Sequence, residues 1–202
     1  MQFEADNPRT AQITATTMPW QGRLFAVHAD KIVLAEGEGE LSRDYLVHPG
    51  AVAIVPLRQV EGQWQVALIY QYRHPVRANL WEIPAGLTDI EGEELLQTAK
   101  RELAEEIQME AETWNVLVDT YASPGCSTEK IRVFLARNLR PTALPEGFVR
   151  EGEEAEMHME WVNLDKIQRA IFEGKLHNPS VITGVLATVC AVQSNFKDLR
   201  AA

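Results

Sequence analysis

The sequence has little cysteine and no long apolar run, and each shortage excludes a class of protein. Only Cys126 and Cys190 occur among 202 residues, so a disulfide framework is excluded and the cytoplasm is the default compartment. No apolar run is long enough to cross a membrane, and the opening residues MQFEADNPRT lack the pattern of a signal peptide. We therefore expect no membrane partner and no secretion.

Basic residues are also scarce. Lys and Arg number 19 against 29 Asp and Glu, which gives a formal net charge of −10. Broad nucleic-acid binding needs surfaces rich in Lys and Arg, so we expect no nucleic-acid partner. An acidic protein that acts on a phosphorylated substrate needs cations to screen the approach of that substrate, and this favours a metal.

Acidic residues gather in one stretch, GLTDIEGEELLQTAKRELAEEIQM, which runs from Gly86 to Met109. At about 100° per residue, a helix over this stretch has one apolar stripe, made of Leu95, Leu96, Ala99, Leu103 and Ile107. Glu106 projects inside the stripe and Glu102 lies at its margin, whereas a solvated helix places its acids opposite the apolar face. Carboxylates against a core are costly unless a positive partner meets them. Because residues i, i+3 and i+4 share a face, Glu102, Glu105 and Glu106 can surround Mg²⁺ or Mn²⁺.

The alternative is that this stretch is an ordinary solvated acidic helix. The spacing of its glycine, arginine and glutamates argues against that alternative. The stretch resembles the Nudix box. That motif has a glycine, then a glutamate some residues later, and after seven more residues the pattern Arg-Glu-apolar-any-Glu-Glu-any-Gly-apolar. The matching residues are Gly86, Glu93, Arg101, Glu102, Leu103, Glu105, Glu106 and Met109. Six residues instead of the usual five separate Gly86 from Glu93, and Gln108 replaces the last glycine. Glycine there normally supplies a left-handed cap, so we expect Gln108 to cost about 1 kcal/mol or to change the helix exit.

The segments around the box predict a mixed α/β protein in two parts. Alternation of apolar and polar residues predicts a small N-terminal β appendage over residues 1–48, with two strands in 22–34 that turn near Ala29–Asp30 and a third at 41–48. The exposed edges of this appendage suit pairing with a second subunit. Residues 49–202 form the larger domain, with strands at 51–57, 64–72, 114–121, 131–138 and 157–163. Helices follow from Asp165 and Asn178–Pro179, so we expect a sheet between the box helix and the C-terminal helices.

Three charged residues before the box are candidates for substrate binding. Arg73 and Arg77 are candidate phosphate clamps in an acidic protein, and ordinary surface ion pairs are the alternative for both. Glu82 is a candidate ligand for a ribose hydroxyl, with a structural salt bridge as an equal alternative. A long loop over 140–156 carries several glutamates, and loops of this length in compact domains are usually functional or disordered.

The resemblance covers most of the chain from about Gly22 onward and implies the α/β/α Nudix fold. The N-terminal strands, the run QYRHPVRANLWEIPAG and the Ser-Pro-Gly loop at 123–125 are similar to the ADP-ribose pyrophosphatases of that family. The resemblance implies Mg²⁺-dependent hydrolysis of ADP-ribose to AMP and ribose 5-phosphate by a homodimer whose N-terminal strands exchange. Metal ligands would then be Glu102, Glu105, Glu106 and the carbonyl of Ala85.

Further roles follow from the same resemblance. Glu93 and Arg101 are expected to pair and shape the loop rather than to contact substrate. The general base that reaches the attacking water is expected on the long loop, at Glu153 or Glu154, with Glu153 preferred. The box recognises only a diphosphate, so another nucleoside diphosphate sugar or a dinucleotide remains an alternative substrate. A non-catalytic nucleotide-binding module is a second alternative, against which the intact set of acids argues.

Overall fold

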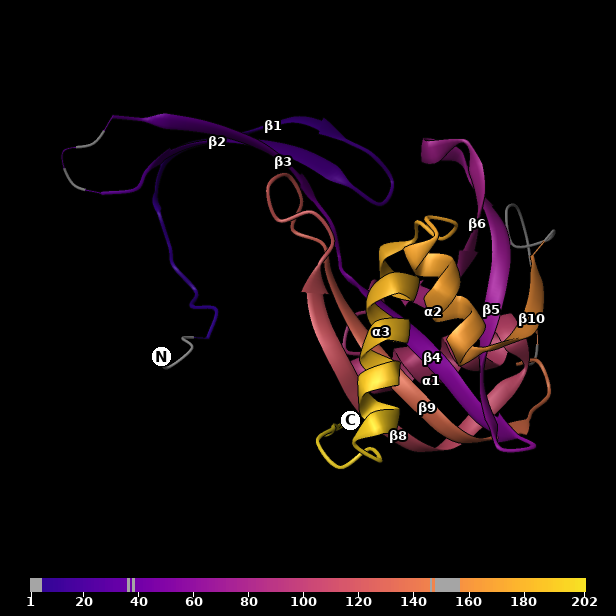
Figure 1. The fold of residues 1–202 in the computed structure, drawn as a ribbon. Helices are drawn as coiled ribbons and strands as arrows, with labels where there is room; N and C mark the ends of the chain where they lie inside the picture. The colour runs from indigo at the N-terminus through magenta and orange to yellow at the C-terminus, as the bar shows by residue number, and fades with distance from the viewer. Residues whose placement is uncertain (1–4, 36, 38, 146, 148–156) are drawn as a thin grey trace. The chain divides into compact units, whose positions relative to one another are not determined.

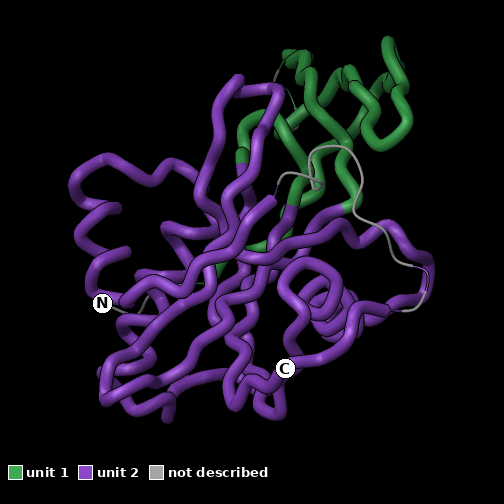
Figure 2. Tube along the Cα trace, turned by 90° about the vertical axis from the view of Figure 1, so that its right-hand side faces the viewer, with its two compact units in different colours: residues 1–49, 123–129 green, residues 50–122, 130–202 purple. Residues whose placement is uncertain are grey.

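The computed structural model describes residues 5–35, 37, 39–145, 147 and 157–202 (Figure 1). The chain divides into two compact units, coloured separately in Figure 2. The N-terminal unit comprises residues 1–49 and 123–129, and the large unit comprises 50–122 and 130–202. The loop at 123–129 joins the N-terminal unit because Leu46 N–H donates to the carbonyl of Cys126 (2.8 Å) and Thr128 N–H donates to the carbonyl of Leu46 (3.0 Å).

The N-terminal unit is a three-stranded antiparallel sheet in the order β1-β2-β3, formed by β1 (Gln12–Gln21), β2 (Ala26–Val33) and β3 (Leu41–Val47). The turn expected near Ala29–Asp30 is wrong, because both residues pair with β1 and β3 in the middle of β2. The chain reverses instead at 22–25, where Gly22 N–H donates to the carbonyl of Phe25 (2.8 Å). Strand β1 is exposed along its whole length, so its residues lack the alternation of a half-buried strand.

The large unit holds one sheet in the order β10-β5-β4-β9-β8-β11, with β6 added to β5 and β7 added to β4. The pair β4–β9 is parallel and the others are antiparallel. The bounds are β4 Ala51–Val60, β5 Gln63–Arg73, β6 Ala78–Glu82, β7 Ala85–Leu87, β8 Met109–Tyr121, β9 Lys130–Pro141, β10 His158–Asn163 and β11 Arg200–Ala201. The expected strands of this domain are thus confirmed, most of them a few residues longer than predicted.

Within the residues that the structure describes, three α-helices cover this sheet: α1 (Leu95–Ile107), α2 (Leu164–Phe172) and α3 (Pro179–Gln193). Helix α3 begins as expected, with the Asn178 side chain accepting from Val181 N–H at 3.1 Å. Helix α2 begins one residue before Asp165, so Asp165 lies in the first turn and does not cap the helix. No helix in the described part of the chain is long and apolar enough to cross a membrane.

Alternate residues of β4 face opposite layers, as the pleat of a strand requires. Val52 and Ile54 pack in one buried cluster with Leu103 of α1. Val55 and Leu57 pack in a second cluster, which includes buried residues of α2 and α3. The expected α/β/α arrangement is confirmed, and in Figure 1 helices α2 and α3 lie on one side of the sheet. The burial of apolar area on both faces is the main stabilising contribution.

The C-terminal strand β11 is held to the sheet by a charge network around Asp119. Asp119 on β8 accepts from Arg132 of β9 through Nε (2.7 Å) and Nη2 (3.1 Å), and from Arg200 of β11 through Nη1 (3.0 Å). The Asp119 side chain is 23% exposed. The hydrogen bond from Arg132 and then that from Arg200 outweigh the effect of burial and hold the pKa of Asp119 below its usual range.

We predict that Asp119→Asn lowers the free energy of unfolding by about 1–3 kcal/mol at neutral pH. Because the folded-state pKa of Asp119 is depressed, its stabilisation is present above the unfolded-state pKa of about 3.9 and is lost as the pH falls through the folded value. Urea unfolding at a series of pH values should therefore show the gap to wild type closing in acid. Glu112→Gln is the control, since Glu112 is exposed and its Oε1 lies 3.6 Å from Nη1 of Arg140. A gap for Asp119→Asn that is the same at every pH would contradict this account.

Candidate functional site

Helix α1 carries the box acids and packs on the sheet through the apolar stripe that its sequence predicts. Ala99, Leu103 and Ile107 are buried, and Leu95 and Leu96 are partly buried against the same cluster. The loop before the helix is fastened to its first turn, since Thr98 Oγ1 donates to Glu93 Oε2 at 2.9 Å. Packing of the stripe therefore fixes the direction in which each acid of the box projects.

Glu106 lies within the buried face of α1, as the helical wheel predicts. Glu106 is only 7% exposed, and its Oε2 accepts from the backbone N–H of Ala85 at 3.0 Å. Ala85 begins β7, which pairs with β4, so this N–H is held rigidly by the sheet. The structure thus brings Ala85 and Glu106 together through the N–H of Ala85. Metal binding by the Ala85 carbonyl stays a prediction.

Arg101 joins the other three acids of the box. Its guanidinium donates to Glu93 through Nε and Nη2, each at 3.3 Å. Nη1 donates to Glu102 Oε1 at 2.7 Å and to Glu105 Oε2 at 2.9 Å. The predicted pairing of Glu93 with Arg101 is confirmed, and a single nitrogen of the same arginine holds both Glu102 and Glu105.

The charges in this cluster support one another. Burial alone would lower the pKa of Arg101, but the three carboxylates outweigh burial and raise this pKa above its usual range. The hydrogen bond from Arg101 in turn lowers the pKa of Glu93. Among the residues that the structure describes, no three His, Cys, Asp or Glu side chains are arranged to hold a metal ion. Glu102 and Glu105 are turned toward Arg101, which supplies positive charge at this place.

The residues of the cluster nevertheless fit a hard divalent cation. Glu102, Glu105 and Glu106 offer only carboxylate oxygens, which Mg²⁺ and Mn²⁺ prefer. Gly86 explains how the carboxylate of Glu102 can lie against β7, because a β-carbon at this position would overlap that carboxylate. The glycine of the box therefore leaves room for the Glu102 side chain in its present position.

Arg73 and Glu82 form an ion pair on the strands that precede the box. Arg73 Nε donates to Glu82 Oε1 at 3.0 Å and Nη2 donates to Oε2 at 2.7 Å. Glu82 is only 3% exposed, whereas the Arg73 side chain is 40% exposed. Of the two alternatives for Glu82, the structure shows the salt bridge, and contact with a ribose stays a prediction. Arg77 is exposed at the end of the short 3₁₀ turn η1 (His74–Val76).

The two candidate bases, Glu153 and Glu154, lie outside the described residues. His158, which follows that segment, is exposed. The centroid of its ring lies 5.2 Å from that of Tyr70 and 5.6 Å from that of Trp81. One further residue near Arg73 was missed by the sequence reasoning, namely Gln71, a buried amide beside the Arg73–Glu82 pair.

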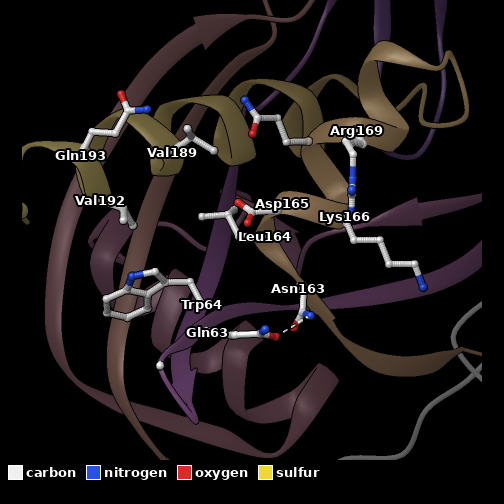
Figure 3. A pocket seen from close by; sticks show the side chains of 12 residues that line it. Gln63, Trp64, Asn163, Leu164, Asp165, Lys166, Arg169, Val189, Val192 and Gln193 are labelled. Carbon is white, nitrogen blue, oxygen red and sulfur yellow. Dashed lines mark hydrogen bonds between the residues drawn. The ribbon is translucent and has the colours of Figure 1, made fainter.

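A separate pocket of about 480 Å³ lies on the face of the sheet that α2 and α3 cover (Figure 3). Figure 3 shows Trp64, Leu164, Val189 and Val192 around it, with polar side chains from β5, β10 and α2. Gln63 and Asn163 are joined across its lining by a hydrogen bond of 2.9 Å. None of the residues predicted for the site lines this pocket, so we distinguish it from the cluster on α1.

Similarity to known proteins shows the family to which this α/β/α protein belongs. The model of the NUDIX domain matches residues 47–182, and the chain belongs to this family. The resemblance drawn from the box is therefore confirmed. A solved structure entitled "Crystal structure of ADP compounds hydrolase" matches 95% of this chain and 98% of its own, with a TM-score of 0.73 and 19% identity, which shows the shared fold.

Three curated proteins are similar to this chain in sequence. The ADP-ribose pyrophosphatase of Mycobacterium tuberculosis (strain ATCC 25618 / H37Rv) is 41% identical over 179 residues, which cover 89% of this chain and 83% of the relative. The ADP-ribose pyrophosphatase of Bacillus subtilis (strain 168) is 33% identical over 120 residues, covering 59% and 62%. The methanol dehydrogenase activator of Bacillus methanolicus is 28% identical over 183 residues, covering 91% of each chain.

The end of α1 shows how Gln108 replaces the glycine of the box. Gln108 adopts the left-handed conformation (φ 54°, ψ 44°), and its N–H donates to the carbonyl of Ala104 at 3.1 Å. The helix exit is therefore that of a glycine cap, and the side chain of Gln108 bears the cost of the left-handed conformation.

We predict that Gln108→Gly raises the free energy of unfolding by about 0.5–1 kcal/mol, because relief of the left-handed strain exceeds the entropy that glycine adds to the unfolded chain. Gln97→Gly is the matched control on the same helix, at an exposed position with helical backbone. It should lower the free energy by about 1 kcal/mol. Urea unfolding measures both changes, and equal losses in the two variants would show that the left-handed cap carries no strain.

Proposed function

We propose that this protein hydrolyses the pyrophosphate bond of ADP-ribose to AMP and ribose 5-phosphate, with Mg²⁺ as the cofactor and Mn²⁺ as the alternative. The observation that carries the proposal is the buried carboxylate of Glu106 beside the other box acids on α1. A carboxylate in an apolar layer costs stability, so a structural role alone does not account for it. The substrate is proposed from the 41% identity with an ADP-ribose pyrophosphatase over most of both chains.

The acids of α1 are assigned to the metal. Glu102, Glu105 and Glu106 would hold it, with the carbonyl of Ala85 as a further ligand. When bound, Mg²⁺ would withdraw charge from the diphosphate oxygens and lower the pKa of a coordinated water. Glu102 and Glu105 now share Nη1 of Arg101, so these two carboxylates would turn from Arg101 toward the metal. Glu93 would keep Arg101 in place through its two contacts.

The remaining residues are assigned to the substrate and to the proton. Arg73 would neutralise a phosphate, and Arg77 would assist from the exposed turn beside it. Glu82 would fix Arg73 and is the candidate for a ribose hydroxyl. A water would attack one phosphorus in line, and Glu153 or Glu154, with Glu153 preferred, would take its proton. We place the protein in the cytoplasm, without a nucleic-acid or membrane partner.

The test is release of phosphomonoester by the purified protein with Mg²⁺ from ADP-ribose, ADP-glucose, GDP-mannose, NADH and diadenosine polyphosphates. AMP that comes chiefly from ADP-ribose, and that stops with EDTA, supports the proposal. Turnover of another compound in the panel would support the same reaction with a different substrate. Folded protein that binds nucleotide but turns over none of the panel would instead favour the non-catalytic binding module.

We predict that Glu106→Gln abolishes turnover with little change in thermal stability. The amide keeps the size of the side chain and an oxygen for the N–H of Ala85, but it removes the charge that a cation needs. Steady-state rates and a melting curve measure the two effects. Glu110→Gln is the control, since Glu110 is exposed and pairs with Arg140. Substantial activity of Glu106→Gln at saturating Mg²⁺ would rule out its role as a ligand.

We also propose a homodimer formed through the N-terminal sheet. Three large apolar residues of β1 are more than half exposed, namely Ile13, Met18 and Trp20. Strand β1 is also an edge of its sheet, so its outer backbone groups suit pairing with a second copy. Apolar exposure on an edge strand favours association over solvation.

We predict that the double variant Met18→Glu, Trp20→Glu shifts the protein from dimer to monomer, because it places two charges on that apolar surface. Light scattering on a sizing column measures the mass. Gln12→Glu is the control, since it adds charge at the start of the same strand without removing apolar area. A wild-type mass of one chain would contradict the proposed dimer, and an unchanged dimer in the double variant would move its interface elsewhere.

A further inference from the structure

Thr98 places a hydroxyl in the buried first part of α1. It is 0% exposed, as is its neighbour Ala99 in the apolar cluster between α1 and the sheet. A buried hydroxyl is costly unless it has a hydrogen-bond partner. In a helix the usual partner is the carbonyl four residues earlier, so a hydroxyl that bonds elsewhere indicates a more specific contact.

Thr188 of α3 is equally buried and shows the usual contact, since its Oγ1 donates to the carbonyl of Gly184 at 2.7 Å. The corresponding carbonyl in α1, that of Glu94, is 3.4 Å from Thr98 Oγ1, whereas Oε2 of Glu93 is 2.9 Å away. A hydroxyl has one proton, and the nearer, charged acceptor takes it. Thr98 is therefore turned from its own helix toward the carboxylate in the loop.

Glu93 needs this second anchor because Arg101 is shared with other acids. Arg101 contacts Glu93 through Nε and Nη2, each at 3.3 Å. The same guanidinium is nearer to the acids of the helix, at 2.7 Å from Glu102 and 2.9 Å from Glu105. Arg101 thus lies closer to the proposed metal ligands than to the residue that would hold it away from them. In the described part of the chain, the shortest side-chain contact of Glu93 is the one with Thr98.

We propose that Thr98 is a positioning residue for the metal site, which anchors Glu93 so that Glu93 can retain Arg101. The inference rests on the proposed function, in which Glu102 and Glu105 bind the metal. When a cation draws these two carboxylates away, Glu93 alone retains the guanidinium. Without the Thr98 hydroxyl, Glu93 and Arg101 can move together toward the acids of α1. The guanidinium would then compete with the cation for the same oxygens, and metal binding would weaken.

The test is Mn²⁺ binding to the purified protein without substrate, followed by the paramagnetic resonance of free Mn²⁺. Thr98→Val keeps the shape of the side chain and removes the hydroxyl, so the Kd for Mn²⁺ should rise about tenfold. Thr98→Ser keeps the hydroxyl and should bind Mn²⁺ as the wild type does. Glu106→Gln identifies the site, because binding at the box acids should be lost in this variant.

Glu93→Ala completes a double-mutant cycle. It removes the carboxylate through which Thr98 acts, so the Kd should rise, and adding Thr98→Val should then change the Kd no further. Steady-state kinetics give a second readout. Thr98→Val should need about tenfold more Mg²⁺ for half-maximal rate, while kcat at saturating Mg²⁺ changes far less.

Thr188→Val is the matched control, since it removes a hydroxyl of equal burial that donates within its own helix. It should lower the melting temperature and leave the Kd for Mn²⁺ unchanged. The same pattern in Thr98→Val would show a purely structural hydroxyl and would overturn the inference. An equal rise in Kd with and without Glu93 would overturn it as well. If Thr98→Val does not fold, Thr98→Ala replaces it, and the same rise in Kd is expected.

The outcomes separate this inference from the proposed function. Wild-type protein that binds Mn²⁺ at the box acids but turns over none of the panel contradicts the function, while the Kd values still decide the role of Thr98. Wild-type protein without a Mn²⁺ site that Glu106→Gln removes contradicts both. Active wild type with an unchanged Kd in Thr98→Val overturns the role of Thr98 alone.

Discussion

The burial of one carboxylate is the constraint on which the rest of this site depends. Glu106 lies in the apolar layer between α1 and the sheet, where an ionised group without compensation would be strongly destabilising. A backbone N–H of β7 meets it, and β7 is fixed by pairing with β4. The helix must therefore dock with one face and one register, which also determines where Glu102 and Glu105 project. Gly86 completes this fit by leaving room for Glu102.

Arginines organise the remaining acids in an otherwise acidic protein. Arg101 links the loop residue Glu93 to two carboxylates of α1, so loop and helix are held by one guanidinium. Arg73 is held by Glu82 and lies beside the buried amide of Gln71. In both places a cation is fixed beside carboxylates before any substrate arrives. Preorganised charge of this kind is what the hydrolysis of an anionic diphosphate requires.

The strands and helices of the large unit follow from sequence because their periodicity is strong. The wheel placed Glu106 in the apolar face of α1, and the resemblance to the Nudix box implied the pair of Glu93 with Arg101; both are seen. The first N-terminal turn was misplaced because exposed strand β1 has no buried face to impose alternation. Gln71 was missed because the Arg73–Glu82 pair beside it forms only through the pairing of β5 with β6, which the sequence does not show. The base was assigned by resemblance alone, and Glu153 and Glu154 lie outside the described residues.

A crystal structure of the protein grown with Mn²⁺, with data recorded at the manganese absorption edge, would show whether the acids of α1 hold a metal. We expect an anomalous peak bounded by carboxylate oxygens of Glu102, Glu105 and Glu106, with Arg101 still paired with Glu93 but no longer joining Glu102 to Glu105. Full occupancy of Mn²⁺ elsewhere, with Nη1 of Arg101 unmoved between the two carboxylates, would contradict it.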